Sequence, residues 1–382
     1  MKNLAAFWEK HYNRTSDCPS AKEEGIFRRI NMRVKRIAAL LLSSIIAVSA
    51  LTGCGVDKDA VVATLDDKEI SLGVANFAAR LQQAQYDDFY VAYMGEDVWK
   101  SDMYGTGETM EDMTKDSVLT VIQEMYLLQA HMDDYSITIS EDEANKIAEA
   151  AAKFMSDNED DAIKALGATE DIVEEYLTLL TVQNKMYNAI IADVDTEVSD
   201  EDANTSAYSY VSISKTSYTD EEGNTVEYTD EEKENLLADV KTFLTEAKEQ
   251  GLETAAEGRG YTVSTGIFSA DDTTLDEAVL TALQALTTEG ELSEVVETDN
   301  LYYVLRMDAL TDEEATEEHR EEIIEERKSD LYDEVAGAWK EASEWTVNEK
   351  VWESVTFDNL FTLVEPTTES VDGTEVLETT EE

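Results

Sequence analysis

The period of the hydrophobic pattern changes twice along the chain, and this constrains the fold more than any other feature of the sequence. Over residues 71–190 apolar side chains recur at spacings of three and four, which is typical of amphipathic helices. Residues 206–310 read as strand, helix, strand, helix, strand, with short alternating runs. Helical spacing returns from Glu313. The sequence therefore predicts an α+β fold in which an α+β domain interrupts a mainly helical one.

Local signals mark where the first elements begin. Asp66 and Asp67 separate two apolar runs and predict a short hairpin. Ser140 with Glu143 three residues later is a capping box, which predicts a helix start. The terminal helix carries an apolar stripe that ends at Trp345 and needs a partner surface. We expect this helix to dock on the first helical segment.

A basic and then apolar run near the start of the chain has the composition of an export signal. Arg33, Lys35 and Arg36 precede the apolar residues 37–51, a run shorter than the roughly 20 residues of a membrane-spanning helix. The ending Leu-Thr-Gly-Cys at Cys54 resembles the lipobox of bacterial lipoproteins. That resemblance implies acylation of the Cys54 thiol and cleavage just before it. The alternative is an N-terminal anchor helix with a chance cysteine.

These patterns predict a division of the chain into six segments. Residues 1–31 are expected to be an over-extended gene start, with a cytoplasmic extension as the alternative. Residues 365–382 are rich in Thr and Glu and lack core residues, so we expect a disordered acidic tail. Between them we expect a signal peptide at 32–53, a helical domain at 54–200, an inserted domain at 206–310 and a helix completing the helical domain at 311–364.

Charge and cysteine content exclude several classes of function. The chain has 29 basic and 86 acidic residues, a formal net charge of −57, which repels nucleic acid and anionic lipid headgroups. Membrane attachment would therefore depend on acyl chains at Cys54. Beyond Cys54 there is no cysteine to form a disulfide. The three histidines do not cluster and no zinc spacing is present, so we expect no metal and no cofactor.

Three segments resemble the SurA/PrsA family, exported foldases with a parvulin-type peptidyl-prolyl isomerase domain. Residues 61–70, followed by an amphipathic helix, are similar to the opening of that family. Residues 290–298, Gly-Glu-Leu-Ser-Glu-Val-Val-Glu-Thr, are similar to a parvulin segment. Residues 347–355 are similar to the family's return to its helical domain. The resemblance implies a SurA N-terminal-like chaperone domain with an inserted parvulin-like domain.

The resemblance also implies an active site, from which this sequence departs. Where parvulins carry two strand histidines, this chain has Tyr210 and Tyr303, which are the implied catalytic positions. Phe268, Leu275 and Val279 match the apolar residues that surround the proline ring. Tyrosine hydroxyls donate and accept hydrogen bonds, so both tyrosines remain candidates. The alternative is that both are core aromatics with one polar tip.

The predicted function is that of a foldase held by a lipid on the extracytoplasmic face of a bacterial cell membrane. It would bind unfolded secreted polypeptides, and its isomerase domain would be degenerate. Five methionines are candidates for adaptable client contacts or for core positions: Met94, Met103, Met110, Met113 and Met125. An active peptidyl-prolyl isomerase is the first alternative, and a structural lipoprotein without clients is the second. The sequence specifies neither the clients nor the oligomeric state.

Overall fold

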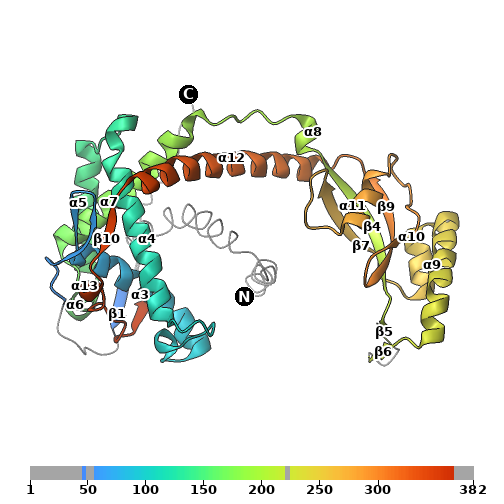
Figure 1. The fold of residues 1–382 in the computed structure, drawn as a ribbon, viewed down its shortest axis with the longest axis horizontal. Helices are drawn as coiled ribbons and strands as arrows, with labels where there is room; N and C mark the ends of the chain where they lie inside the picture. The colour runs from blue at the N-terminus through green and yellow to red at the C-terminus, as the bar shows by residue number, and fades with distance from the viewer. Residues whose placement is uncertain (1–44, 49–55, 220–223, 365–382) are drawn as a thin grey trace, which may run out of the picture. The chain divides into compact units, whose positions relative to one another are not determined.

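The computed structural model describes residues 45–48, 56–219 and 224–364 (Figure 1). They divide into two compact units, each with its own core. The helical unit takes its residues from Met1–Asp193 and Ser329–Glu382, and the inserted unit is Val194–Lys328. The predicted α+β class is confirmed. Cys54 and the predicted segments 1–31 and 365–382 lie outside the described residues.

Five α-helices form the first part of the helical unit. They are α3 (Leu72–Met94), α4 (Met110–Ala130), α5 (Glu141–Asp157), α6 (Asp160–Leu166) and α7 (Glu170–Ile190), with short 3-10 turns η1 (Val98–Lys100), η2 (Met132–Tyr135) and η3 (Ile191–Asp193). The Ser71 side chain caps α3 by accepting from the Val74 N–H. The predicted capping box of Ser140 and Glu143 starts α5. Polar caps thus set the helix starts where the sequence placed them.

Two small antiparallel sheets close the helical unit. The predicted hairpin consists of β2 (Val61–Leu65) and β3 (Lys68–Ser71), and Asp66 makes its turn with a φ of 50°. β10 (Trp345–Val347) adds to the free edge of β2, and the short helix α13 (Glu349–Trp352) follows. The second sheet pairs β1 (Ile45–Val48) with β11 (Phe361–Val364). The sequence did not predict β10 or β11.

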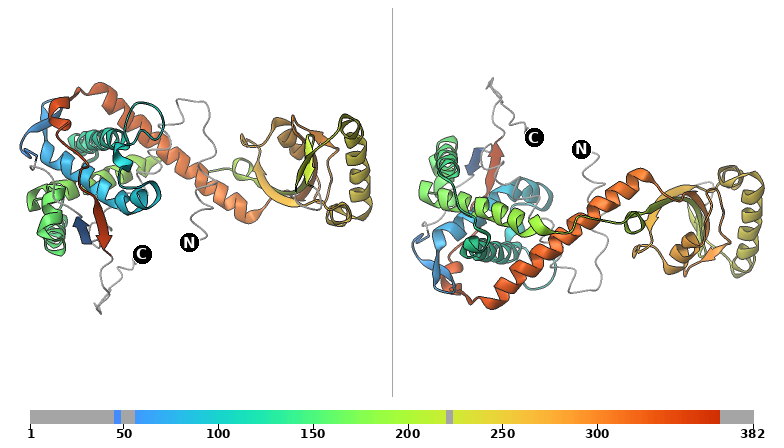
Figure 2. Two further views of the ribbon diagram at one scale, coloured as in Figure 1. Left: turned by 90° about the horizontal axis from the view of Figure 1, so that it is seen from below. Right: turned by 90° about the horizontal axis from the view of Figure 1, so that it is seen from above.

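Strand β1 comes from the middle of the predicted signal segment. Figure 2 shows this dark blue strand beside the red strand β11 in both views. The Ile46 side chain is buried in the main core of the unit, and Val48 packs against that core. The predicted signal segment would be removed by cleavage. In the uncleaved chain, four of its residues form one strand of a sheet. The rest of the predicted signal segment lies outside the described residues.

The apolar stripe on the second half of the long helix α12 (Glu313–Ala342) packs on a partner surface formed by α4 and α7. Tyr332 and Ala336 are buried against Val182 and Met186 of α7. The Tyr332 hydroxyl donates to the buried Glu124 carboxylate of α4. Burial raises the pKa of Glu124 above its usual value, and the hydrogen bond from Tyr332 opposes that shift. The terminal helix is thus joined to α4 and α7 by both apolar and polar contacts.

A buried polar network ties the last described residues to α3. The Arg80 guanidinium donates to the carbonyls of Ala165 (3.3 Å) and Thr356 (2.6 Å). Gln83 donates to the Asp87 carboxylate (3.2 Å) and to a carbonyl of the segment before β11. Asp87 also accepts from the Trp99 indole and from the Phe361 N–H, each at 2.6 Å. Burial lowers the pKa of Arg80 to about 10 and raises that of Asp87.

Removing Arg80 should destabilise the helical unit strongly. Arg80→Ala leaves buried carbonyls and the Asp87 carboxylate without their donor or countercharge, so we expect a loss of about 3 kcal/mol in the free energy of unfolding. Urea unfolding followed by tryptophan fluorescence measures this loss, since Trp99 and three further tryptophans lie in the helical unit. The control is Lys146→Ala, whose ion pair with Asp142 is exposed and should matter by less than about 0.5 kcal/mol. Equal losses in the two variants would contradict the role of the network.

The inserted unit is built on one four-stranded antiparallel sheet. Its strand order is β7 (Ser264–Ser269), β4 (Thr205–Ser214), β9 (Leu301–Ala309), β8 (Val296–Glu297). Three helices accompany the sheet: α9 (Asp230–Gln250), α10 (Leu252–Arg259) and α11 (Glu277–Gln284). A hairpin of β5 (Ser217–Thr219) and β6 (Thr225–Glu227) follows β4.

The two faces of this sheet belong to different cores. Val211 of β4 and Val304 of β9 pack with α9 and α10, the yellow helices that cover one face in Figure 2. Tyr208 of β4 and Leu305 of β9 point the other way and pack with α11. Successive residues of a strand face opposite sides, so this alternation follows from the sequence. It gives α11 and the strands a separate apolar face, which holds the candidate site.

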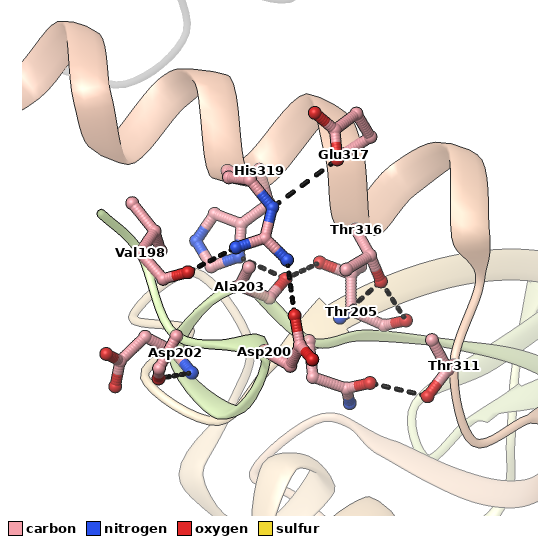
Figure 3. Close-up of polar contacts among 12 residues, drawn as sticks. Val198, Asp200, Asp202, Ala203, Thr205, Thr311, Thr316, Glu317 and His319 are labelled. Atoms are coloured by element: carbon pink, nitrogen blue, oxygen red, sulfur yellow. Dashed lines mark hydrogen bonds and ion pairs between the residues drawn. The ribbon is translucent and has the colours of Figure 1, made fainter. Parts of the chain in front are cut away.

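Polar contacts join the entry and exit segments of the inserted unit. The short helix α8 (Asp200–Ala203) precedes β4, and the first turns of α12 lie beside it (Figure 3). The Arg320 guanidinium contacts the Asp200 carboxylate (2.9 Å) and donates to the Val198 carbonyl. Thr316 accepts from the Thr205 N–H at 3.1 Å. These contacts place residues 194–205 and 311–328 in the unit, which is therefore wider than the predicted 206–310.

Candidate functional site

All five residues that the sequence predicted for the isomerase site lie in one apolar cluster. Phe268 of β7 and Val279 of α11 are buried in it, and Tyr210, Tyr303 and Leu275 are half-buried at its edge. The cluster lies on the face of the sheet that α11 covers. The structure thus brings together residues from four segments that are far apart in sequence. Their catalytic and binding roles stay predictions.

The two tyrosines are diagonal neighbours on adjacent strands. Tyr210 lies opposite Leu305, and Tyr303 lies two residues before Leu305 on the same face. Their ring centroids are 6.0 Å apart, with the planes inclined at 49°. This geometry places two phenols at the edge of an apolar cluster, at the positions where parvulins carry two histidines.

A third tyrosine, which sequence reasoning missed, supports this pair. The Tyr208 ring lies 5.6 Å from that of Tyr210 and 5.9 Å from that of Phe268. It covers Gly266, its partner across β4 and β7. A Cβ atom at Gly266 would lie 2.7 Å from the ring, so only glycine leaves room for it. The signal in the sequence was the glycine within a strand, which marks a close approach.

The loop before α11 fixes the position of the apolar residues on the other side of the site. The Asp272 carboxylate accepts from the N–H groups of Thr274 (2.6 Å) and Leu275 (3.1 Å). Asp276 caps α11 by accepting from the Ala278 N–H at 2.9 Å. These bonds set the direction in which Leu275 enters the cluster and α11 begins. Hydrogen-bonded loops of this kind hold side chains in one rotamer and so preform a pocket.

The phenols of Tyr208 and Tyr303 keep their protons at neutral pH. Burial raises the pKa of Tyr208 to about 12. Burial also raises the pKa of Tyr303, with smaller contributions from Tyr210 and Asp276. A protonated phenol both donates and accepts hydrogen bonds. The site therefore combines apolar side chains with the protonated hydroxyl groups of Tyr208 and Tyr303.

This chemistry suits a reaction without a covalent step. Rotation about an X-Pro amide is slow because resonance holds the bond planar, with a barrier of about 18–20 kcal/mol. A pocket that holds the proline ring and favours the twisted amide lowers that barrier. Phe268, Leu275 and Val279 are the residues predicted to surround the ring, and Tyr210 and Tyr303 are those predicted to present hydroxyls at its edge.

Replacing Gly266 by alanine should disrupt the site by displacing Tyr208. The new methyl group would overlap the ring, so we expect the free energy of unfolding to fall by about 1–3 kcal/mol. We also expect faster amide exchange in β4 and β7. Hydrogen exchange read by mass spectrometry measures this. Gly258→Ala in α10 is the matched control, because its Cβ meets no neighbour and alanine favours helix. Similar exchange in both variants would contradict the packing described here.

The helical unit exposes apolar side chains where α3 ends and α4 begins. We call six of them the methionine–aromatic patch: Phe89, Tyr93, Met94, Met103, Tyr104 and Met113. Their exposed fractions run from 36% to 77%, which is far above core values. Met110 is half-buried against the core and Met125 is buried. Three of the five methionines considered for client contact are therefore available at the surface.

Comparison with known proteins assigns the inserted unit to a domain family. The family described as the PPIC-type PPIASE domain matches residues 214–323. Tyr303, Phe268, Leu275 and Val279 fall within the match, and Tyr210 lies four residues before it. The chain therefore carries a parvulin domain of the PPIC type, and the predicted resemblance is confirmed at that level.

Curated relatives and solved structures carry related names. The foldase protein PrsA of Clostridium botulinum strain Langeland is 25% identical over 265 residues, which cover 64% of this chain and 76% of the relative. PrsA of strain Okra is 25% identical over 278 residues, or 67% and 79% of the two chains. The crystal structure of foldase protein PrsA from Lactococcus lactis covers 78% of this chain and 97% of its own, at 12% identity and a TM-score of 0.31.

Proposed function

We propose that this chain, which carries a PPIC-type isomerase domain and is related to PrsA foldases, is an extracytoplasmic foldase that binds unfolded polypeptides. A lipid on Cys54 holds it to the membrane after cleavage of residues 32–53. The helical unit contacts clients through the methionine–aromatic patch. The inserted unit, with tyrosines in place of histidines, retains a proline pocket of reduced activity.

The methionine–aromatic patch is the observation that carries the chaperone role. Exposed apolar groups of this size on a soluble unit mark a surface that binds other molecules. The ring centroids of Phe89 and Tyr93 lie 4.9 Å apart, so these two exposed rings present one shared apolar surface. Methionine side chains are flexible and polarisable, and they adapt to varied partners. Such a surface suits unfolded chains, which differ in sequence but share exposed apolar groups.

Charge and composition support the proposed location and the choice of client. The net charge of −57 keeps loaded complexes soluble and attracts basic clients. Within the described residues, no helix has the length and apolar character needed to cross a membrane. The proposal places membrane attachment at Cys54, through its acyl chains. Anionic lipid headgroups would repel the acidic body and hold it away from the surface.

Polar substitutions in the patch should weaken client binding. The triple variant Phe89→Gln, Tyr93→Gln, Met103→Gln removes three exposed apolar groups, each contributing about 1 kcal/mol when covered by a client. We expect at least a tenfold rise in the concentration needed to suppress aggregation of a urea-unfolded protein. Light scattering after dilution from urea measures it. Tyr218→Gln with Leu310→Gln, exposed apolar residues of the inserted unit, is the control and should suppress aggregation normally.

The isomerase alternative is favoured by one observation, the pair of tyrosines at the half-buried edge of an apolar cluster. We expect the chain to accelerate cis–trans exchange of an Ala-Pro peptide, as read by NMR exchange spectroscopy. Tyr303→Phe should slow this exchange about tenfold, the value of one hydrogen bond of about 1.4 kcal/mol. Leu275→Ala should also slow it, because the ring loses apolar contact.

Tyr302→Phe is the matched control for the catalytic tyrosine. Tyr302 neighbours Tyr303 on β9, but its side chain packs on the opposite face of the sheet with α9 and α10. This variant should exchange the peptide at the rate of the unmodified chain. Suppressed aggregation without any catalysed exchange would leave the chaperone and exclude the isomerase. Absence of both activities would favour a structural lipoprotein.

A further inference from the structure

Strand β1 occupies a strip of the helical unit between β11 and α6. The Ile46 side chain is 2% exposed, and its N–H donates to the Asn158 Oδ1 atom at 2.6 Å. Asn158 is itself buried and is held by a bond from its Nδ2 atom to the Phe154 carbonyl (2.8 Å). The strip therefore has a built acceptor for a main-chain N–H. It also has a pocket for one apolar side chain.

The two edges of β11 have different partners. The N–H groups of Phe361 and Leu363 donate to Asp87 (2.6 Å) and Asp88 (3.0 Å) of α3. In a strand, alternate N–H groups point to opposite sides, so those of Thr362 and Val364 face β1. On β1, the Ile46 N–H points away from β11 to Asn158, which agrees with this alternation. The main-chain N–H groups on one edge of β11 are thus bonded to α3, and those on the other edge pair with β1.

Cleavage before Cys54 removes β1 and uncovers this strip. The main-chain groups at Thr362 and Val364, the Asn158 acceptor and the Ile46 pocket would then lose their partners together. Unpaired main-chain groups at a strand edge readily accept another strand. Extended peptides bind proteins in this way, with main-chain bonds giving affinity and alternate side chains giving selectivity.

We propose that this strip is a binding site for an extended apolar segment of a client polypeptide, and that β1 is its built-in occupant until cleavage. The inference rests on the proposed function, which supplies the cleavage and the client. The ligand needs apolar side chains at two alternate positions, as Ile46 and Val48 provide. The exposed residues Glu159 and Asp160 begin α6, the helix that contacts β1, so acidic segments are disfavoured.

The test uses the full chain with Cys18→Ser, Cys54→Ser and a site-specific protease sequence in place of residues 49–53. The probe is a fluorescent copy of residues 43–50, Ser-Ser-Ile-Ile-Ala-Val-Ser-Ala, whose binding is read by anisotropy. Before cutting, tethered β1 competes at an effective concentration in the millimolar range, and cutting removes this advantage. We expect the cut chain to bind the probe at least tenfold more tightly than the uncut chain.

Two matched comparisons locate the binding. Thr362→Pro removes the main-chain N–H that faces the ligand, whereas Thr362→Val keeps it. The Thr362 side chain itself is exposed. We expect the proline variant to bind the probe at least tenfold more weakly than the valine variant. A probe with Asp in place of the residue at Ile46 should also bind at least tenfold more weakly. The comparison of the two probes requires no substitution in the protein, so it still tests the proposal if the Thr362→Pro variant does not fold.

Equal affinity of the cut and uncut chains for the probe would overturn the proposal. So would equal affinity for the two probes. A cut chain that dimerises without taking up the probe would also overturn it, because β11 edges would then pair between copies. A cut chain that still suppresses aggregation but does not bind the probe would leave the proposed function intact. In that case only this site would be excluded.

Discussion

Buried donors on α3 and α4 that bind main-chain carbonyls near the end of the chain hold the helical unit together. Arg80 reaches the Thr356 carbonyl, and Lys115 of α4 reaches that of Val355 at 2.8 Å. A buried cation is costly unless it is fully hydrogen-bonded, so these carbonyls are required partners. Their loss would free β11 and with it the closing sheet. The remaining contacts of β11 with this unit depend on these hydrogen bonds.

In the inserted unit, one four-stranded sheet packs against a separate core on each of its two faces. β4 and β9 send alternate side chains to α9 and α10 on one face and to α11 on the other. The face with α9 and α10 is closed, whereas the edge of the α11 face leaves Tyr210 and Tyr303 half-buried. That half-buried edge carries the two tyrosines that the sequence predicted for the isomerase site.

Local signals in the sequence predicted much of this arrangement. The Ser140 capping box and the Asp66 turn depend on neighbouring residues only, so their positions could be read directly. Tyr210 and Tyr303 were paired by the family resemblance alone, and the register of β4 and β9 places them on one face of the sheet. The role of Arg80 could not be predicted, since its partner carbonyl lies 276 residues away. Tyr208 was missed because its packing on Gly266 depends on the register of β4 and β7.

The contacts between α3 and residues 355–361 also set an order of folding as the chain is synthesised from its N-terminus. The first helices are made early, but their contacts with β11 cannot form until the whole inserted unit and the last strand have followed. Distant contacts of this kind form slowly because a long loop must close first. The inserted unit has its own compact core and can fold before the helical unit is complete. During that interval the helical unit lacks the strand that completes its core.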